Sequence, residues 1–292
     1  ITPVPDHVTR MFALKNGEFD MALNIAAKDL DDLASQGFTV ITSPTGAGAM
    51  GLVYDNADPN SPFSKLEVRQ AIQHAIDTEA IVKNVYFGKA EAANQWIYKS
   101  HWGYNPDVVG YPYNPEKAKE LLAQAGYPNG FKTKITYITT PEADQVYTIV
   151  QAYLKEVGID VQLEPVQNNK WTEIAFNGGK WEGMFHGGIT GNPDVAGALA
   201  SRYIGGGKYY ASAHFPEDYV QAVVNAITAP DFETKQKYTQ EAMKLMIDKY
   251  ALRLVLVLFQ DSMVTHPYVH NTGNFQNASS IWWTPEEAWM DK

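Results

Sequence analysis

The apolar side chains of this sequence follow two spacings, one typical of helices and one typical of strands. Over residues 142–157 they recur every three or four positions, which indicates one face of a helix that Gly158 ends. Residues 159–164 alternate apolar and polar side chains, and residues 132–139 do so with many β-branched residues. A third strand is predicted over 181–185, after a helix around Trp171. This alternation of strands and helices indicates an α/β unit with a parallel sheet.

A second group of strand patterns lies outside this unit, over residues 37–41, 51–56, 252–259 and 263–270. We therefore expect two bodies. Residues 1–57 and 252–292 are predicted to form part of one lobe (lobe I), and residues 58–251 a second, α/β lobe (lobe II). The chain would then cross between the lobes near residues 53–55 and 256–260. Two crossings beside a cleft are typical of a hinge that closes on a ligand.

Composition narrows the choice of partners. The 292 residues carry a formal net charge of −10 and 45% apolar residues, and no stretch gathers Lys and Arg, so nucleic acid is not an expected partner. The absence of cysteine excludes disulfides, thiolate metal sites and a cysteine nucleophile. The longest apolar run, residues 254–259, is too short to cross a membrane. Because the chain opens on Ile1 with no initiator Met, we expect a targeting segment upstream.

Ten short stretches of the chain, taken together, carry a resemblance to a known family. They lie at residues 13–20, 62–63, 67–72, 74–77, 87–88, 102–106, 113–118, 125–128, 154–161 and 192–194. They resemble the family 5 extracellular solute-binding proteins, the oligopeptide-, dipeptide- and nickel-type binding components of ABC importers. The resemblance implies a periplasmic-binding-protein-like, two-lobed α/β fold (type II, cluster C-like). It also implies that the N-terminal part of the first lobe, with its subdomain, is missing.

The same resemblance implies a receptor that catalyses no reaction and needs no cofactor. Such a receptor captures a solute, with a short peptide as the first expectation, in the cleft between the lobes by hinge closure. It then delivers the solute to the transmembrane subunits of an ABC permease. We expect it to act outside the cytoplasm, in a periplasm or as a lipoprotein anchored on the outer face of the cytoplasmic membrane.

The segment from Phe185 to Asp194 is the main candidate for a ligand site. It follows a predicted parallel strand, and ligands of such sheets bind beyond the carboxyl ends of the strands. Its glycines would expose backbone N–H and C=O groups to a ligand, with a plain tight turn as the alternative. The candidate ligand-binding residues in this segment are His186, Gly187, Gly188, Ile189, Thr190 and Asn192.

The identity of residue 189 bears on the ligand class. In peptide-binding relatives, the resemblance implies that this segment bonds to an extended peptide and supplies an aspartate that pairs with its amino terminus. Counting back from Pro193, that position is Ile189. A buried ammonium group needs an opposite charge, so the departure weakens the case for a peptide. An oligosaccharide is the second expectation, and nickel chelates, haem and opine-like compounds stay open.

Four further residues are candidate ligand contacts. Trp96 and Trp171 lie near predicted loops or helix starts, where an indole face can stack on sugars, apolar groups or cations, although core packing is the commoner role. Phe259 and Gln260 lie at the second predicted crossing, where relatives place residues that face the cleft.

Patterns that could indicate other chemistry are weak. Residues 46–51 match G-x-G-x-x-G, but a strand follows where a dinucleotide site needs a helix. His266 and His270 lie four apart in a strand-like run, which separates them, so no metal site is assigned. No H-E-x-x-H or G-x-S-x-G motif is present, and no catalytic residue is assigned. An α/β hydrolase is the alternative from another class, and it would need a nucleophile, a base and an orienting group in mutual reach.

Overall fold

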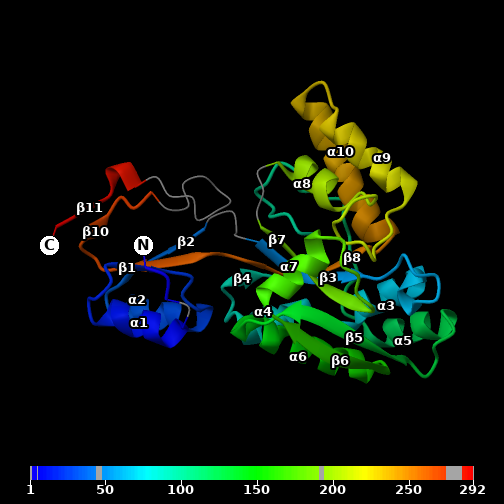
Figure 1. Cartoon of the computed structure of the whole chain (residues 1–292), viewed down its shortest axis with the longest axis horizontal. Coiled ribbons are helices and arrows are strands. Elements are labelled where there is room, and N and C mark those ends of the chain that lie inside the picture. The colour runs from blue at the N-terminus through cyan, green and yellow to red at the C-terminus, as the bar shows by residue number, and fades with distance from the viewer. Residues whose placement is uncertain (1, 5, 44–47, 191–193, 274–284, 292) are drawn as a thin grey trace.

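The computed structural model describes residues 2–4, 6–43, 48–190, 194–273 and 285–291 (Figure 1). Its α-helices are α1 (His7–Lys15), α2 (Leu30–Ser35), α3 (Leu66–Ala75), α4 (Thr78–Val85), α5 (Pro115–Gln124), α6 (Pro141–Glu156), α7 (Asn168–Phe176), α8 (Val195–Arg202), α9 (Glu217–Ile227) and α10 (Phe232–Lys244). Its strands are β1 (Met21–Leu23), β2 (Thr39–Thr42), β3 (Gly48–Tyr54), β4 (Ala90–Glu91), β5 (Phe131–Ile138), β6 (Ile159–Val166), β7 (Met184–Thr190), β8 (Arg253–Phe259), β9 (Ser262–Thr265), β10 (Val269–His270) and β11 (Trp289–Met290). The strands form sheets with the orders β1-β9-β2, β10-β11 and β4-β8-β3-β7-β5-β6.

The middle of the six-stranded sheet is buried on both faces. Every residue of β3 is buried, which a strand in the middle of a covered sheet requires. Leu52 and Tyr54 contribute to a core with α3 to α6, whereas Ala49 and Val53 contribute to a second core with α7 to α10. Successive side chains of a strand point to opposite faces, so the two cores lie on opposite sides of the sheet. Figure 1 shows α8, α9 and α10 on one side and α4 and α6 on the other.

The parallel unit predicted from the sequence is present. β5 pairs in parallel with β6 along its whole length, and with β7 at Met184 and Phe185. Helices α6 and α7 connect these strands. Thr140 starts α6, because its side chain accepts a hydrogen bond from the backbone N–H of Ala143. The unit therefore folds as its spacing of apolar residues predicts.

The assignment of two strands to lobe I was wrong. β3, within residues 1–57, and β8, within residues 252–292, are neighbours in the six-stranded sheet. Both strands are almost wholly buried, and the helices on each side of the six-stranded sheet cover them. The smaller body consists of the antiparallel sheet β1-β9-β2, whose Val264 packs in one core with residues of α1 and α2. The chain crosses between the two sheets from β2 to β3 and from β8 to β9.

The stretch around residues 62–77, which contributes to the family resemblance, holds the larger body together. The buried Arg69 donates hydrogen bonds to the carbonyl oxygens of Phe63 (2.8 Å), Ser64 (3.1 Å) and Tyr250 (2.8 and 3.1 Å). It therefore ties α3 to the segment that leads into β8. Asp77 caps α4 by accepting a hydrogen bond from the N–H of Ala80. Both side chains form their hydrogen bonds with backbone groups of the same body, so their role is structural.

Gly51 provides a test of the sheet. It lies at an irregularity of the β3–β8 pairing, and a Cβ there would lie 2.1 Å from the carbonyl oxygen of Leu254. We expect Gly51→Ala to lower the free energy of unfolding by about 2 kcal/mol or more, because a backbone atom must move. The control Gly207→Ala adds a Cβ with no other group within 4 Å, and should change stability by less than about 1 kcal/mol. Urea unfolding measures the stability of both variants. Equal free energies of unfolding for the native protein and Gly51→Ala would contradict the close approach of residue 51 to the backbone of Leu254.

Candidate functional site

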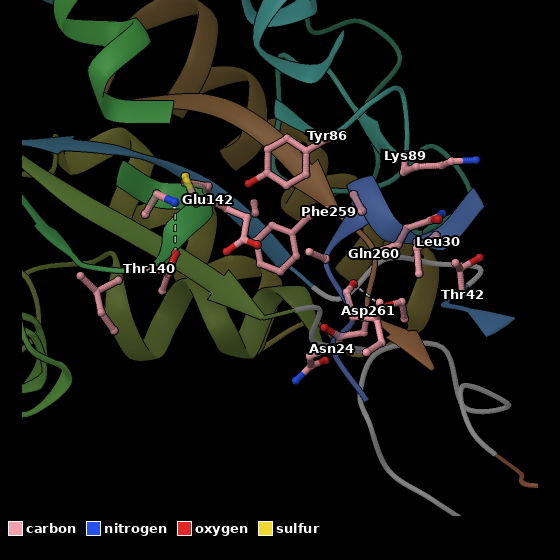
Figure 2. A pocket seen from close by; sticks show the side chains of 18 of the residues that line it. Asn24, Leu30, Thr42, Tyr86, Lys89, Thr140, Glu142, Phe259, Gln260 and Asp261 are labelled. Atoms are coloured by element: carbon pink, nitrogen blue, oxygen red, sulfur yellow. Dashed lines mark hydrogen bonds between the residues drawn. The ribbon is translucent and has the colours of Figure 1, made fainter. Parts of the chain in front are cut away.

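A cavity of about 920 Å³ lies between the three-stranded and the six-stranded sheets (Figure 2). Its volume lies within the usual range for small-molecule sites. One wall comes from residues 24–27, from α2 and from Val40 and Thr42 of β2. The other comes from β3, from the segment joining β5 to α6, and from residues of α7, β7 and α8. The site therefore draws on both bodies of the chain.

The two crossings are hydrogen bonded to each other beside this cavity. The backbone N–H of Ser43, just after β2, donates to the carbonyl oxygen of Asp261, just before β9, at 3.0 Å. Gln260 and Asp261 line the cavity at this point. Antiparallel pairing resumes on either side, between β2 and β9 and between β3 and β8.

The cavity reaches the carboxyl end of β5, where a parallel sheet places its ligands. β5 pairs with β7 at Met184 and Phe185, and from His186 onward no described strand pairs with the edge of β7 that faces β5. Trp171 of α7 lies at this gap and donates its indole N–H to the carbonyl oxygen of His186 at 3.0 Å. Trp171, His186 and Ile138, the last residue of β5, all line the cavity.

His186 presents a neutral imidazole to the cavity. It is 7% exposed, and its Nδ1 lies 2.9 Å from the hydroxyl oxygen of Tyr147. Burial, and then the positive charge of Arg253, lower the pKa of His186 to about 3. At neutral pH the side chain is therefore a polar and uncharged part of the wall.

The cavity wall carries charges of both signs. Lys89 and Asp31 form an ion pair of 2.6 Å between the two bodies. The carboxylates of Glu142 and Asp261 form no hydrogen bond or ion pair with any other described residue. Burial raises the pKa of Asp261. The guanidinium of Arg202 lies 5.5 Å from the ring centre of Phe176 and pairs with no described carboxylate.

The structure brings together four of the ten residues proposed from the sequence. Trp171, His186, Phe259 and Gln260 line the cavity. Trp96 does not: it is buried in the core, where its indole N–H points to Met243 Sδ at 2.8 Å and Arg253 lies over its ring. Asn192 lies outside the described residues. Ligand contact by any of these residues stays a prediction.

The prediction that residues 186–190 follow the end of a strand was wrong, because they lie within one. His186, Gly187, Gly188, Ile189 and Thr190 lie in β7, paired antiparallel with β3. Close packing explains Gly187: a Cβ there would lie 2.6 Å from the side chain of Val53. Its carbonyl oxygen accepts a hydrogen bond from the buried Arg253. Glycine at residue 187 therefore allows β7 to lie close to the side chain of Val53 on β3.

Sequence reasoning missed several lining residues, among them Tyr86, Lys89, Glu142, Phe176 and Arg202. Glu142 had a usable signal, because it follows the carboxyl end of a predicted parallel strand. The others come from helix ends and connecting segments, and no local pattern marks them. Among the described lining residues, Ser262 donates to Ile25 and His186 pairs with Tyr147, so these two form no nucleophile–base pair.

No group of three or more His, Asp or Glu that could hold a metal ion occurs among the described residues. Within the same part of the chain, no helix is long and apolar enough to span a membrane.

A family profile, described as bacterial extracellular solute-binding proteins, family 5 (middle part), matches residues 1–210. The chain belongs to this family. It is similar to heme-binding protein A of Haemophilus influenzae, with 29% identity over 84% of this chain and 46% of that protein. It is also similar to di/tripeptide-binding protein 1 of Pseudomonas aeruginosa, with 31% identity over 65% of this chain and 36% of that protein. The chain thus spans less than half the length of these relatives.

Solved structures show the same fold. A periplasmic DppA from Helicobacter pylori in complex with the peptide STSA superposes with a TM-score of 0.85 and 24% identity, covering 99% of this chain and 56% of that one. NikA from Brucella suis in complex with Fe(III)-EDTA gives a TM-score of 0.84 and 20% identity, covering 98% of this chain and 60% of that one. The predicted type II, periplasmic-binding-protein-like fold is confirmed for this family 5 chain. At these identities, the likeness concerns the fold alone.

The depressed pKa of His186 predicts a pH dependence of stability. Between its unfolded pKa near 6.5 and its folded value of about 3, the unfolded chain binds more protons, so stability falls as the pH falls. Between pH 7 and pH 4.5 this one group should remove about 2–3 kcal/mol from the free energy of unfolding. His186→Asn keeps a polar partner for Tyr147 without titrating, and should flatten the slope. The control His214→Asn, at an exposed position, should not. Urea unfolding at several pH values measures this, and parallel slopes for all three proteins would contradict the prediction.

Proposed function

We propose that this chain is the ligand-capturing part of an ABC importer's solute receptor, and that its solute is a short peptide. The peptide would bind in the cavity between the two sheets, the two bodies would close on it about the paired crossings, and the complex would dock on a membrane permease. The site of action would be outside the cytoplasm, as the family description indicates. The observation that carries the proposal is a ligand-sized cavity lined from both bodies and bordered by both crossings.

Breaking the ion pair that joins the two bodies at the edge of the cavity would cost little free energy. The ion pair of Lys89 with Asp31 joins the two bodies, and its side chains are 38% and 77% exposed. Exposed pairs of this kind contribute between nothing and about 1 kcal/mol. A contact so weak can form and break as the bodies move, which suits a receptor that must both take up and release its solute.

The wall favours a peptide over an oligosaccharide. Unpaired charges of both signs line the cavity together with aromatic rings such as Trp171 and Phe259. A neutral sugar would leave these charges desolvated and unpaired when the cavity closes, which is costly. A peptide supplies an ammonium group, a carboxylate and apolar side chains. The names of several relatives mention dipeptides or glutathione, which are solutes of this kind.

Thermal unfolding with mixed solutes tests the proposal. The purified protein would first be unfolded and refolded to remove any solute that it carries. It would then be melted with casein hydrolysate below 1 kDa, with maltooligosaccharides, or with free amino acids. We expect the peptides alone to raise the Tm, by about 5 °C or more, because a ligand at one hundred times its Kd adds about 2.7 kcal/mol.

Two outcomes would contradict the proposal. A shift with maltooligosaccharides and none with peptides would make the chain a sugar receptor. No shift with any of the three mixtures, from a protein with a cooperative melt, would remove the assignment as a peptide receptor.

A further inference from the structure

Two unpaired charges of opposite sign border the cavity from different elements. Asp261 lies in the short segment between β8 and β9, and Arg202 is the last residue of α8. Neither forms an ion pair with another described residue. A partly buried charge that lines a cavity without a partner in the protein is a candidate for pairing with a bound ligand.

The carboxylate of Asp261 is the sharper case. Its backbone is fixed, because its carbonyl oxygen accepts the hydrogen bond from Ser43, yet its side chain lines the cavity without a partner among the described residues. Figure 2 shows Asp261 on the wall between Phe259 and Asn24.

Arg202 is placed differently. Its guanidinium lies over the ring of Phe176, at 5.5 Å from the ring centre, and Phe176 itself lines the cavity. An aromatic face orients a guanidinium and leaves its in-plane N–H groups free to donate. Those donors match a carboxylate, which can accept two parallel hydrogen bonds.

From this arrangement we infer that Asp261 and Arg202 are the charge anchors of the ligand. Asp261 pairs with the ligand's ammonium group beside the crossings, and Arg202 pairs with its carboxylate beside α7 and α8. The missing carboxylate at Ile189 is thereby replaced from a different element. The inference rests on the proposed peptide-binding function and adds to it a preference for peptides with both ends free.

One of the remaining charges of the described wall, that of Glu142, competes for this role. Lys89 and Asp31 neutralise each other at 2.6 Å. His186 stays neutral. Glu142 is a second carboxylate without a partner among the described residues, so the test compares it directly with Asp261.

Chemically blocked peptides and matched variants test the inference. The casein hydrolysate would be used untreated, with its amines acetylated, or with its carboxylates amidated. For the native protein we expect the Tm shift with untreated peptides and its loss with either blocked form. Asp261→Asn and Arg202→Gln should each reduce the shift with untreated peptides by about half or more, because an opposite charge within the closed site is worth at least about tenfold in affinity.

Two controls separate binding from folding. Without ligand, Asp261→Asn should melt at the native Tm or higher, since it removes an unpaired and partly buried charge. Asp160→Asn and Lys237→Gln change charges at exposed positions on β6 and α10, and should keep the full peptide shift.

The outcomes are distinct. If untreated and blocked peptides shift the native Tm equally, the charge anchors are overturned while the receptor role stands. If Glu142→Gln reduces the shift and Asp261→Asn does not, the ammonium anchor is Glu142, and the assignment of Asp261 is overturned. If untreated peptides give no shift at all, the proposed function fails, and this inference fails with it.

Discussion

The hydrogen bond from the N–H of Ser43 to the carbonyl oxygen of Asp261 marks the place where the two bodies of this protein meet. On either side of this hydrogen bond, β2 pairs antiparallel with β9 and β3 pairs antiparallel with β8. The packed cores on either side resist deformation, so the proposed closure would take place beside Ser43 and Asp261, where the chain passes between the sheets. Because the cavity borders these residues, any such motion changes its width directly. The account of ligand capture depends on this geometry.

Residues within the family resemblance and residues that line the cavity are largely different sets. Arg69 satisfies backbone carbonyls inside the larger body, and Asp77 caps a helix. Such residues specify how the body folds, whatever it binds. The cavity wall, by contrast, includes Asp261, Glu142 and Arg202, which lie outside the stretches that carry the resemblance. This explains why the family is evident from the sequence while the ligand class has to be argued from the site.

The parts of the fold that could be predicted have a strong local pattern. The unit from β5 to β7 follows from alternating strands and one amphipathic helix. The position of β3 and β8 could not be predicted, because a strand that is apolar on both faces looks the same whichever sheet it joins. In the site, a strand end indicated His186, a crossing indicated Phe259, and an indole near a predicted helix start indicated Trp171. Gly187 was misinterpreted because close packing and an exposed loop both call for glycine, and only the tertiary structure distinguishes them.

Closure of the two bodies on a ligand is the central claim, and a distance measurement across the cavity tests it most directly. Because the sequence has no cysteine, Ser35→Cys on α2 and Lys170→Cys on α7 give a single pair of spin labels at exposed positions. Other residues of these two helices line opposite walls of the cavity. Electron–electron double resonance should show a shorter and narrower distance distribution when peptides that raise the Tm are added. An unchanged distribution with such peptides would contradict capture by closure about the paired crossings.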